Sequence, residues 1–299
     1  MSSGPALAGQ VALVTGGGKG LGRAFALHLA ELGASVVVNN RNREVDADGL
    51  GPADHVVREI IAAGGTAVAE HSDVTDPGAA DAMVRTALEA YGRLDVLVTS
   101  AAVSLPQMFH KTTAPNFRTV LETNVVGTVL VASAAAAVMR EAGHGRIVLI
   151  ASTAGLHGEP TVSAYAASKG AVIALGRTMA AEGASKNVLT NVLLPYATTQ
   201  MTEAGMDQRY AERMRSALVA PVVSALADPG STINGQVIVA AGAALRATDT
   251  VEHGTVLLPE GELSSAELEN LLATSRKGEP HTFAHAQDAF QSLAADLTT

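Results

Sequence analysis

Residues 10–22 read QVALVTGGGKGLG and predict a strand, a glycine-rich turn and a helix, in that order. Gln10–Thr15 is a short β-branched and aliphatic run typical of a buried strand, and residues 21–32 place apolar side chains at helical spacing. Glycines between them allow a tight turn and a close approach of the backbone to a pyrophosphate at the helix N-terminus. An ordinary flexible loop is the alternative, but the position between strand and helix favours phosphate binding.

The same alternation of strand and helix continues along the chain. Seven strands separated by helices predict an α/β fold with a doubly wound, seven-stranded parallel sheet of the Rossmann type. We assign residues 1–242 to a dinucleotide-binding catalytic domain and residues 243–299 to a C-terminal extension, packed on that domain or at a dimer interface. The remaining predicted strands are 34–38, 66–70, 94–98, 146–150, 188–194 and 236–240, and the remaining predicted helices are 52–63, 77–91, 115–141, 163–185 and 207–227.

Two segments interrupt the alternation. Residues 41–52 form a polar insert after the second strand. In the extension we expect a helix from Ser264, because Ser264 and Glu267 have the spacing of a capping box. The last residues are polar, and we expect them to be loosely held.

Composition excludes several classes of protein. Of the 299 residues, 47% are apolar and 16% charged, with a net charge of −9, so the chain can bury a large core and lacks the basic surface of a nucleic-acid-binding protein. Cysteine is absent, which excludes disulfides and thiolate metal sites, and we expect no metal at all. We find no leader sequence and no uninterrupted apolar stretch of about 18 residues, so we expect a soluble cytoplasmic enzyme without membrane contact.

Three side chains form a candidate catalytic group. Tyr165 and Lys169 lie four residues apart on a predicted helix and therefore on one face. A nearby ammonium favours the phenolate, so we expect Lys169 to lower the pKa of Tyr165. Ser152 follows the strand 146–150 at the carboxyl edge of the sheet, where ligands bind in open α/β folds, and its hydroxyl could bond a substrate oxygen. Taken singly, Tyr165 and Lys169 also fit a solvated helical pair, and Ser152 also fits a turn residue.

Together with the turn Thr15-Gly-x-x-x-Gly20-x-Gly22, this order resembles the short-chain dehydrogenase/reductase superfamily over residues 9–242. The resemblance implies that Tyr165 is the general acid or base, that Lys169 also binds the nicotinamide ribose, and that Ser152 orients the substrate. It implies that Asn124 helps to hold a water for a proton relay, although a kink or cap is the alternative. Implied cofactor contacts are Thr15, Gly16, Gly18, Lys19, Gly20, Leu21, Gly22, Asn40, Arg41, Asp73, Val74, Ser100, Ala101, Tyr165, Lys169, Pro195, Thr198 and Thr199.

The sequence departs from the superfamily in two places. Where the superfamily has Asn-Asn-Ala-Gly after the fourth strand, residues 99–102 read TSAA, so we expect weaker support between neighbouring strands and a changed pocket width. Where it has Pro-Gly after the sixth strand, this chain has Pro195-Tyr196. Tyr196 then lies near the nicotinamide or substrate, or simply packs in its loop.

The end of the second strand predicts the nucleotide. A carboxylate there would bind the ribose 2′-hydroxyl of NAD(H), but this chain has the neutral Asn40, followed by Arg41. Two cations, Arg41 and Lys19 of the phosphate turn, favour the 2′-phosphate of NADP(H). NAD(H) stays possible. Asp46 and Asp48 in the insert could fold back toward this position.

The longer loop after strand two and the C-terminal extension resemble one branch, the (3R)-hydroxyacyl-CoA dehydrogenase unit of peroxisomal multifunctional enzymes and related bacterial hydroxysteroid dehydrogenases. We expect substrate specificity in residues 104–113, 156–162 and 196–215. These loops could form a pocket for an acyl, polyketide-like or polycyclic group, or simply pack together. The side chains concerned are Met108, Phe109, His110, Leu156, His157, Tyr196, Met201 and Met206.

Three functions compete. We favour an NADPH-dependent ketoreductase acting on the carbonyl or secondary alcohol of an apolar small molecule. The first alternative is an NAD-dependent 3-hydroxyacyl-CoA or hydroxysteroid dehydrogenase, and the second is a non-catalytic dinucleotide-sensing protein, which the presence of both Tyr165 and Lys169 disfavours. The resemblance also implies a homodimer or homotetramer paired through helices 115–141 and 163–185.

Overall fold

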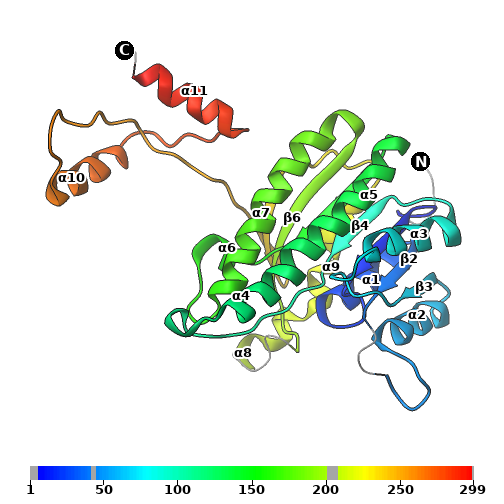
Figure 1. Cartoon of the computed structure of the whole chain (residues 1–299). Coiled ribbons are helices and arrows are strands. Elements are labelled where there is room, and N and C mark those ends of the chain that lie inside the picture. The colour runs from blue at the N-terminus through cyan, green and yellow to red at the C-terminus, as the bar shows by residue number, and fades with distance from the viewer. Residues whose placement is uncertain (1–5, 42–44, 201–207, 298–299) are drawn as a thin grey trace. The chain divides into compact units, whose positions relative to one another are not determined.

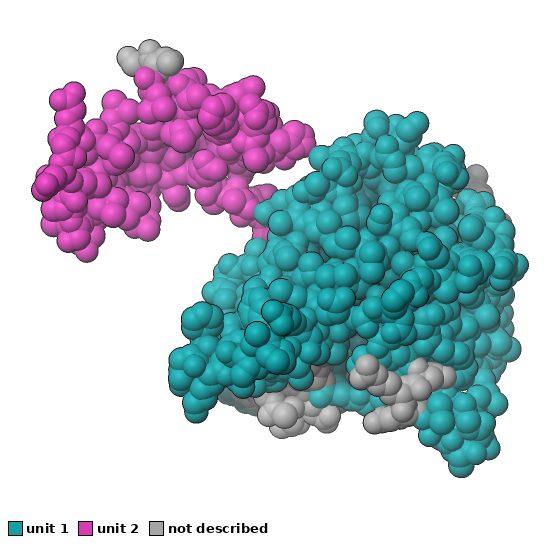
Figure 2. Space-filling view, viewed as in Figure 1, with its two compact units in different colours: residues 1–247 teal, residues 248–299 magenta. Residues whose placement is uncertain are grey.

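The computed structural model of the chain describes residues 6–41, 45–200 and 208–297. The chain divides into two compact units, Met1–Ala247 and Thr248–Thr299 (Figure 2). The first unit ends five residues beyond the predicted boundary at 242, because the chain turns at Gly242 and adds one further strand to the sheet.

The first unit contains one sheet with the strand order β3-β2-β1-β4-β5-β6-β7-β8. Its first seven strands are parallel, which confirms the doubly wound α/β fold. The eighth strand was not predicted and pairs antiparallel with β7 at the edge. The strands are β1 (Val11–Thr15), β2 (Ser35–Asn39), β3 (Thr66–Glu70), β4 (Val96–Thr99), β5 (Gly145–Ile150), β6 (Val188–Tyr196), β7 (Val237–Ala241) and β8 (Ala244–Ala247).

Helices cover both faces of the sheet, so the central strands are apolar on both sides (Figure 1). One core cluster packs under α1 (Gly20–Glu31), α2 (Pro52–Ala62) and α9 (Ala220–Ala227). The other packs under α3 (Ala79–Tyr91), α5 (Thr128–Ala142) and α7 (Ser163–Gly183). The carboxyl ends of the parallel strands therefore meet at one edge, between these layers.

Two predicted helices are interrupted. The helix predicted at 115–141 consists of α4 (Ala114–Leu121), a π-helical turn η2 (Glu122–Gly127) and α5. The helix predicted at 207–227 begins with α8 (Gln208–Ala211), continues through 3₁₀ turns and ends as α9. Periodicity alone predicts neither change of pitch.

The helical stretch Ala114–Ala142 is long and apolar enough, by length and composition, to cross a membrane, which differs from the expectation that no such stretch exists. In its most apolar window 44% of the residues are buried inside the protein. Within this stretch α5 packs against α3, β4 and β5, so contacts with the sheet layer account for much of its apolar character. A buried core helix passes the same test, and the observation is weak evidence for a membrane span.

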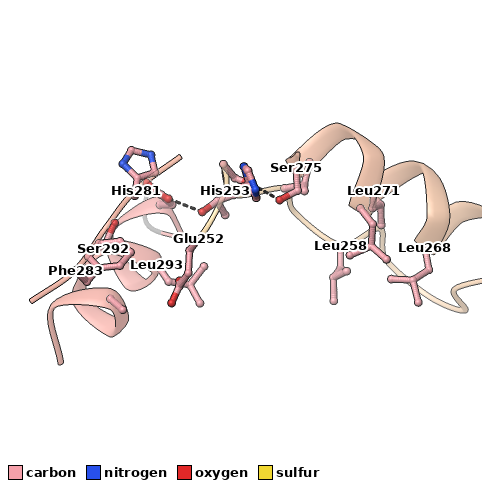
Figure 3. A pocket seen from close by; sticks show the side chains of 16 residues that line it. Glu252, His253, Leu258, Leu268, Leu271, Ser275, His281, Phe283, Ser292 and Leu293 are labelled. Atoms are coloured by element: carbon pink, nitrogen blue, oxygen red, sulfur yellow. Dashed lines mark hydrogen bonds between the residues drawn. The ribbon is translucent and has the colours of Figure 1, made fainter. Parts of the chain in front are cut away.

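The second unit contains α10 (Ser265–Ser275) and α11 (Ala286–Asp296). The predicted capping box is confirmed, because Ser264 N donates to Glu267 Oε2 at 2.9 Å and Glu267 N donates to Ser264 Oγ at 3.3 Å. Helix α11 lies where the sequence was expected to be loosely held. A cavity in this unit is lined by leucines of both helices and by the backbone pairing of Glu252 with His281 (Figure 3). None of the described residues of this unit is buried.

Candidate active site

The glycine turn lies directly against the end of β4. Gly16 has a φ of +65°, and a Cβ added there would lie 2.8 Å from the backbone nitrogen of Ala101. A Cβ added at Gly22 would lie 2.2 Å from the carbonyl oxygen of Gly16. Thr15 Oγ1 accepts hydrogen bonds from the N–H groups of Ser100 (3.1 Å) and Ala101 (3.3 Å). The structure thus brings these predicted cofactor residues together, and only glycine fits the turn.

The missing asparagine does not separate β1 from β4. Thr15 pairs in register with Thr99, and the Thr15 hydroxyl supports the following residues of the loop. The predicted loss of support between the strands is therefore not seen. Among the described residues Thr99 Oγ1 is buried without a hydrogen-bond partner, a defect that typically costs about 1–3 kcal/mol.

The start of α1 fits a pyrophosphate. Among the described residues no side chain caps this helix, and its first turn contains no acidic residue. Backbone N–H groups at such an end are suited to an anion, which fits the dinucleotide implied by the turn. Lys19 is exposed at the N-cap position, and Leu21 packs against the core. Thr199 lies beside Gly20, at 3.6 Å from a Cβ added there.

Arg41 and Asp73, both predicted to contact the adenosine end, pair with each other. Arg41 Nη1 lies 2.8 Å from Asp73 Oδ2. Burial opposes ionisation of Asp73 most strongly, but hydrogen bonds from Arg41 and Thr75 outweigh it and keep the pKa of Asp73 below its usual value. The charge of Arg41, which the sequence predicted as available to a 2′-phosphate, is therefore partly offset by Asp73. The next residue, Val74, is buried and packs against Gly127.

Asn40 borders the phosphate turn. A Cβ added at Gly18 would lie 2.9 Å from Asn40 Cγ, and Asn40 Nδ2 donates to the carbonyl oxygen of Arg41 at 3.1 Å. Asp46 belongs to the insert itself, where its Oδ1 accepts from two backbone N–H groups of that loop at 2.9 Å, those of Asp48 and Leu50. In this conformation Asp46 caps its own loop, and Asn40 is the polar side chain against the turn.

The catalytic residues meet at the carboxyl end of β5. Ser152 lies beside the Tyr165 phenol, close enough that its hydroxyl acts to lower the pKa of that phenol. Lys169 is buried, its Nζ donates to the carbonyl oxygen of Ile150 at 2.8 Å, and Nζ lies 5.6 Å from the centre of the Tyr165 ring. Helix α7 supplies Tyr165 and Lys169, and the loop after β5 supplies Ser152.

The acidity of Tyr165 differs from the prediction. Burial raises the pKa of Tyr165 above its usual value of 10.0, and the opposing hydrogen bond from Ser152 is the smaller effect. Burial also lowers the pKa of Lys169 to about 8. Desolvation of the phenol is the dominant effect on its pKa, and the Lys169 ammonium donates to the carbonyl oxygen of Ile150. At neutral pH Tyr165 is therefore a protonated hydroxyl, ready to act as an acid.

Asn124 lies in the π-helical turn and is fully buried. Its Nδ2 donates to the carbonyl oxygen of Val103 and to Ser168 Oγ, both at 3.0 Å, and its Oδ1 accepts from Val103 N at 2.8 Å. Ser168 Oγ donates in turn to the carbonyl oxygen of Tyr165 at 2.7 Å. Both amide N–H bonds are used within the protein, so the side chain ties the loop after β4 to α7. The role of Asn124 in holding a water stays a prediction.

The sequence analysis missed Gly155, which brings α6 (Ala154–His157) onto α7. A Cβ added at Gly155 would lie 2.6 Å from the backbone of both Lys169 and Gly170. This close packing fixes the segment that begins at Ser152, whose Oγ accepts from Ala154 N at 3.2 Å. In the sequence, the position of Gly155 three residues after Ser152 was the signal that could have indicated this contact.

Replacing Gly155 by Ala is expected to lower kcat about 10²-fold, because the clash with the α7 backbone moves Ser152 away from Tyr165. Gly170→Ala is the matched control, since a Cβ there would meet its nearest atom, the Gly155 oxygen, at 3.4 Å. Steady-state turnover of both variants is the measurement. Equal rates for the two variants would show that this packing does not position Ser152.

Residues after β6 pack among themselves more than predicted. Pro195 is half-buried at the end of β6, and Tyr196 is 46% exposed. Thr198 N donates to the Met214 carbonyl oxygen at 2.7 Å, and Thr198 Oγ1 donates to that of Ala211 at 3.1 Å. The hydroxyl of Thr198 thus donates within its own segment, and its contact with a cofactor stays a prediction.

The described side chains predicted to line a substrate pocket are exposed or half-buried. Met108 and Phe109 are exposed, Leu156 is half-buried, and His110 and His157 are exposed. Within the described ranges no group of three or more His, Cys, Asp or Glu side chains could hold a metal ion. Met201 and Met206 lie outside the described residues.

A family model described as short chain dehydrogenase matches residues 10–212. The chain belongs to this family. It is therefore an oxidoreductase of the short-chain dehydrogenase family, whose members bind an NAD(P) nucleotide and typically act on small molecules. The residues described above fit such a nucleotide through the uncapped start of α1, the glycine turn and the buried ammonium of Lys169.

Individual relatives agree with this family. Peroxisomal multifunctional enzyme type 2 of Drosophila melanogaster is 39% identical over 84% of this chain, which spans only 42% of that protein. A 3-oxoacyl-[acyl-carrier-protein] reductase of Synechocystis is 38% identical over 66% of this chain and 78% of its own length. The crystal structure of a short chain dehydrogenase from Mycobacterium avium has a TM-score of 0.80 and 32% identity, and covers 93% of this chain and 98% of that one.

Proposed function

We propose that the chain is an NADPH-dependent ketoreductase acting on an apolar substrate with a carbonyl group. The observation that carries this is the buried, protonated Tyr165 phenol beside Ser152. When bound, the nicotinamide supplies a hydride to the carbonyl carbon. Tyr165 gives its proton to the carbonyl oxygen, which becomes the hydroxyl of a secondary alcohol, and Ser152 orients that oxygen. Lys169, with a pKa of about 8, is mostly protonated at neutral pH and suited to bind the ribose hydroxyls.

The raised pKa of Tyr165 favours reduction over oxidation. Oxidation of an alcohol needs the phenolate as a base, and burial disfavours that charged form. Reduction needs the protonated phenol, which is the form present at neutral pH. The protonation state of Tyr165 therefore favours reduction, while the concentrations of nucleotide and substrate set the direction in the cell.

The preference for NADPH rests on the end of β2. Asn40 is neutral against the phosphate turn, and Arg41 and Lys19 provide positive charge nearby. Asp73 partly neutralises Arg41 by its ion pair, which makes Asn40 the more decisive residue. The favoured cofactor is NADP(H), with NAD(H) as the alternative.

The proposed substrate class is an acyl thioester or a similarly apolar ketone. The similarity to a 3-oxoacyl-[acyl-carrier-protein] reductase supports thioester chemistry, and Leu105, Met108 and Phe109 expose apolar side chains in the loop after β4. The second candidate, an NAD-dependent 3-hydroxyacyl-CoA dehydrogenase, is favoured by the 39% identity to the multifunctional enzyme. A dinucleotide-sensing protein without turnover is the third.

Turnover of 3-oxoacyl thioesters and polycyclic ketones, each with NADPH and with NADH, tests these candidates. We expect reduction with NADPH as the better cofactor. A strong NADH preference together with alcohol oxidation would support the dehydrogenase instead. Nucleotide binding without turnover across the panel would support the sensor.

We also propose a homodimer or homotetramer. Val126, Val129 and Leu130 are exposed along the helix α4–η2–α5, and leucines of the second unit are exposed as well, including Leu258 and Leu272. Such apolar surface is typical of a contact between subunits. The mass in solution from light scattering is expected to be two or four times 30.3 kDa, and a monomer at micromolar concentration would contradict it.

A cytoplasmic location is likewise proposed, from the cysteine-free composition, and cell fractionation tests it.

A further inference from the structure

Two loops beside the active site are joined by an isolated parallel bridge between Gln107 and Val162. Gln107 N donates to the carbonyl oxygen of Thr161 at 2.5 Å. Gln107 Oε1 also accepts from Thr113 N at 3.3 Å, and Thr113 is the N-cap residue of α4. We refer to the contacts of Gln107 with Thr161 and Val162 as the loop bridge. It connects the loop after β4 to the segment that leads into α7.

Thr161 is held in an unusual backbone conformation. Its φ is +70°, and in the described part of the chain the other non-glycine residue at positive φ is Asn187, a type that tolerates this region. A β-branched residue there is strained and adopts the conformation only when its surroundings impose it. The hydrogen bond from Gln107 is the contact that holds the Thr161 carbonyl in this orientation.

The strained residue lies just before the helix that carries the catalytic tyrosine. Helix α7 has Val162 at its N-cap position, and in the described structure no side chain caps it. Tyr165 follows within the first turn, which is the part of a helix that frays most easily when its N–H groups lack a cap. The hydroxyls of Thr112 and Ser163, 3.5 Å apart, add a weaker link between the same two segments.

We propose that the loop bridge anchors the uncapped start of helix α7 and thereby positions Tyr165 beside Ser152. Gln107 and Thr161 are positioning residues, because they act through the start of α7. The bridge thus joins the two loops predicted to control substrate specificity to the start of the helix that carries Tyr165. The effect on turnover rests on the proposed ketoreductase function, whereas the effect on Tyr165 itself does not.

A pair of substitutions at position 161 separates backbone conformation from side chain. Glycine adopts a φ of +70° freely, so Thr161→Gly keeps the loop bridge. Proline is fixed near a φ of −65°, so Thr161→Pro breaks it. We expect kcat to fall about 10²-fold in Thr161→Pro and to stay close to wild type in Thr161→Gly, with nucleotide Kd unchanged in both.

The titration of Tyr165 provides a readout independent of turnover. The chain has four tyrosines, so labelling them with ¹³C at Cζ and comparing with Tyr165→Phe assigns the signal. In wild type and in Thr161→Gly the pKa of Tyr165 is expected above 10, and in Thr161→Pro it should fall toward 10 as the first turn becomes exposed. If wild type reduces no carbonyl, the proposed function fails, and this titration still tests the loop bridge.

A second pair covers the case in which Thr161→Pro does not fold. Gln107→Pro removes the donating N–H from the other side of the loop bridge, whereas Gln107→Ala keeps it and removes only the side-chain bond to Thr113. We expect Gln107→Pro to show the low kcat and the shifted titration, and Gln107→Ala a clearly smaller effect. The proposal would be overturned if Gln107→Pro, or a folded Thr161→Pro, kept both the wild-type kcat and the wild-type titration of Tyr165. Equal losses of kcat in Thr161→Gly and Thr161→Pro would overturn it as well.

Discussion

Replacing Tyr165 by Phe should lower kcat for ketone reduction by about three orders of magnitude while leaving nucleotide Kd unchanged. The Tyr165 phenol lies beside Ser152, and phenylalanine keeps the ring but has no proton to give. Steady-state kinetics and nucleotide titration on the same preparation measure both quantities.

Tyr91→Phe is the matched control for this variant. Tyr91 on α3 packs against the core cluster under α3, α5 and α7, and burial raises the pKa of its phenol as well, but it lies outside the group formed by Ser152, Tyr165 and Lys169. It should retain wild-type kcat. A Tyr165→Phe enzyme as active as Tyr91→Phe would mean that another group supplies the proton.

The reaction should also depend on pH in a way that reflects the raised pKa of Tyr165. For reduction the phenol must be protonated, so titration of Tyr165 should not reduce the rate below pH 10.0. For alcohol oxidation the phenolate is required, and the rate should rise with pH up to the raised pKa. A change in the rate of reduction or of oxidation near pH 8 would instead report loss of the Lys169 charge.

Replacing Asn40 by Asp should lower kcat/KM for NADPH about 10²-fold or more, with NADH affected much less. The new carboxylate would lie against the phosphate turn and repel a 2′-phosphate, and opposing like charges of this kind cost several kcal/mol. The ratio of kcat/KM for the two nucleotides measures the effect and cancels general damage to the enzyme.

Asp48→Asn provides the comparison for that switch. Asp48 is an exposed carboxylate of the insert. If the insert folded back onto the nucleotide, removing this carboxylate would change the ratio of kcat/KM for NADPH and NADH. In the structure the insert is organised by Asp46, so we expect no change. Unchanged NADPH preference in Asn40→Asp would remove the argument for NADP(H).

Much of the fold followed from the sequence because parallel strands buried on both faces read as continuous apolar runs. The glycine turn and the group of Ser152, Tyr165 and Lys169 were also predicted, since their spacing is set by one turn and one helix. The π-helical turn was not predicted, because six residues of altered pitch leave an apolar helical pattern unchanged. The edge strand β8 is fully exposed and lacks the burial pattern that marks the other strands.

The roles of several site residues depended on contacts between distant segments. The pairing of Arg41 with Asp73 joins the ends of different strands, and Asn124 is occupied by Val103 and Ser168. The pKa of Tyr165 depends on how deeply the phenol is buried, which spacing from Lys169 does not reveal. In each case the sequence predicted the residue as part of the site, and the structure showed its partner.

The most direct test follows hydride from NADPH deuterated at the transferring position into a 3-oxoacyl thioester. The account predicts that wild-type enzyme consumes the nucleotide and forms a 3-hydroxyacyl product with deuterium at the former carbonyl carbon, and that Tyr165→Phe forms almost none. Absence of deuterated alcohol from thioester and polycyclic ketones alike, with the nucleotide demonstrably bound, would contradict it.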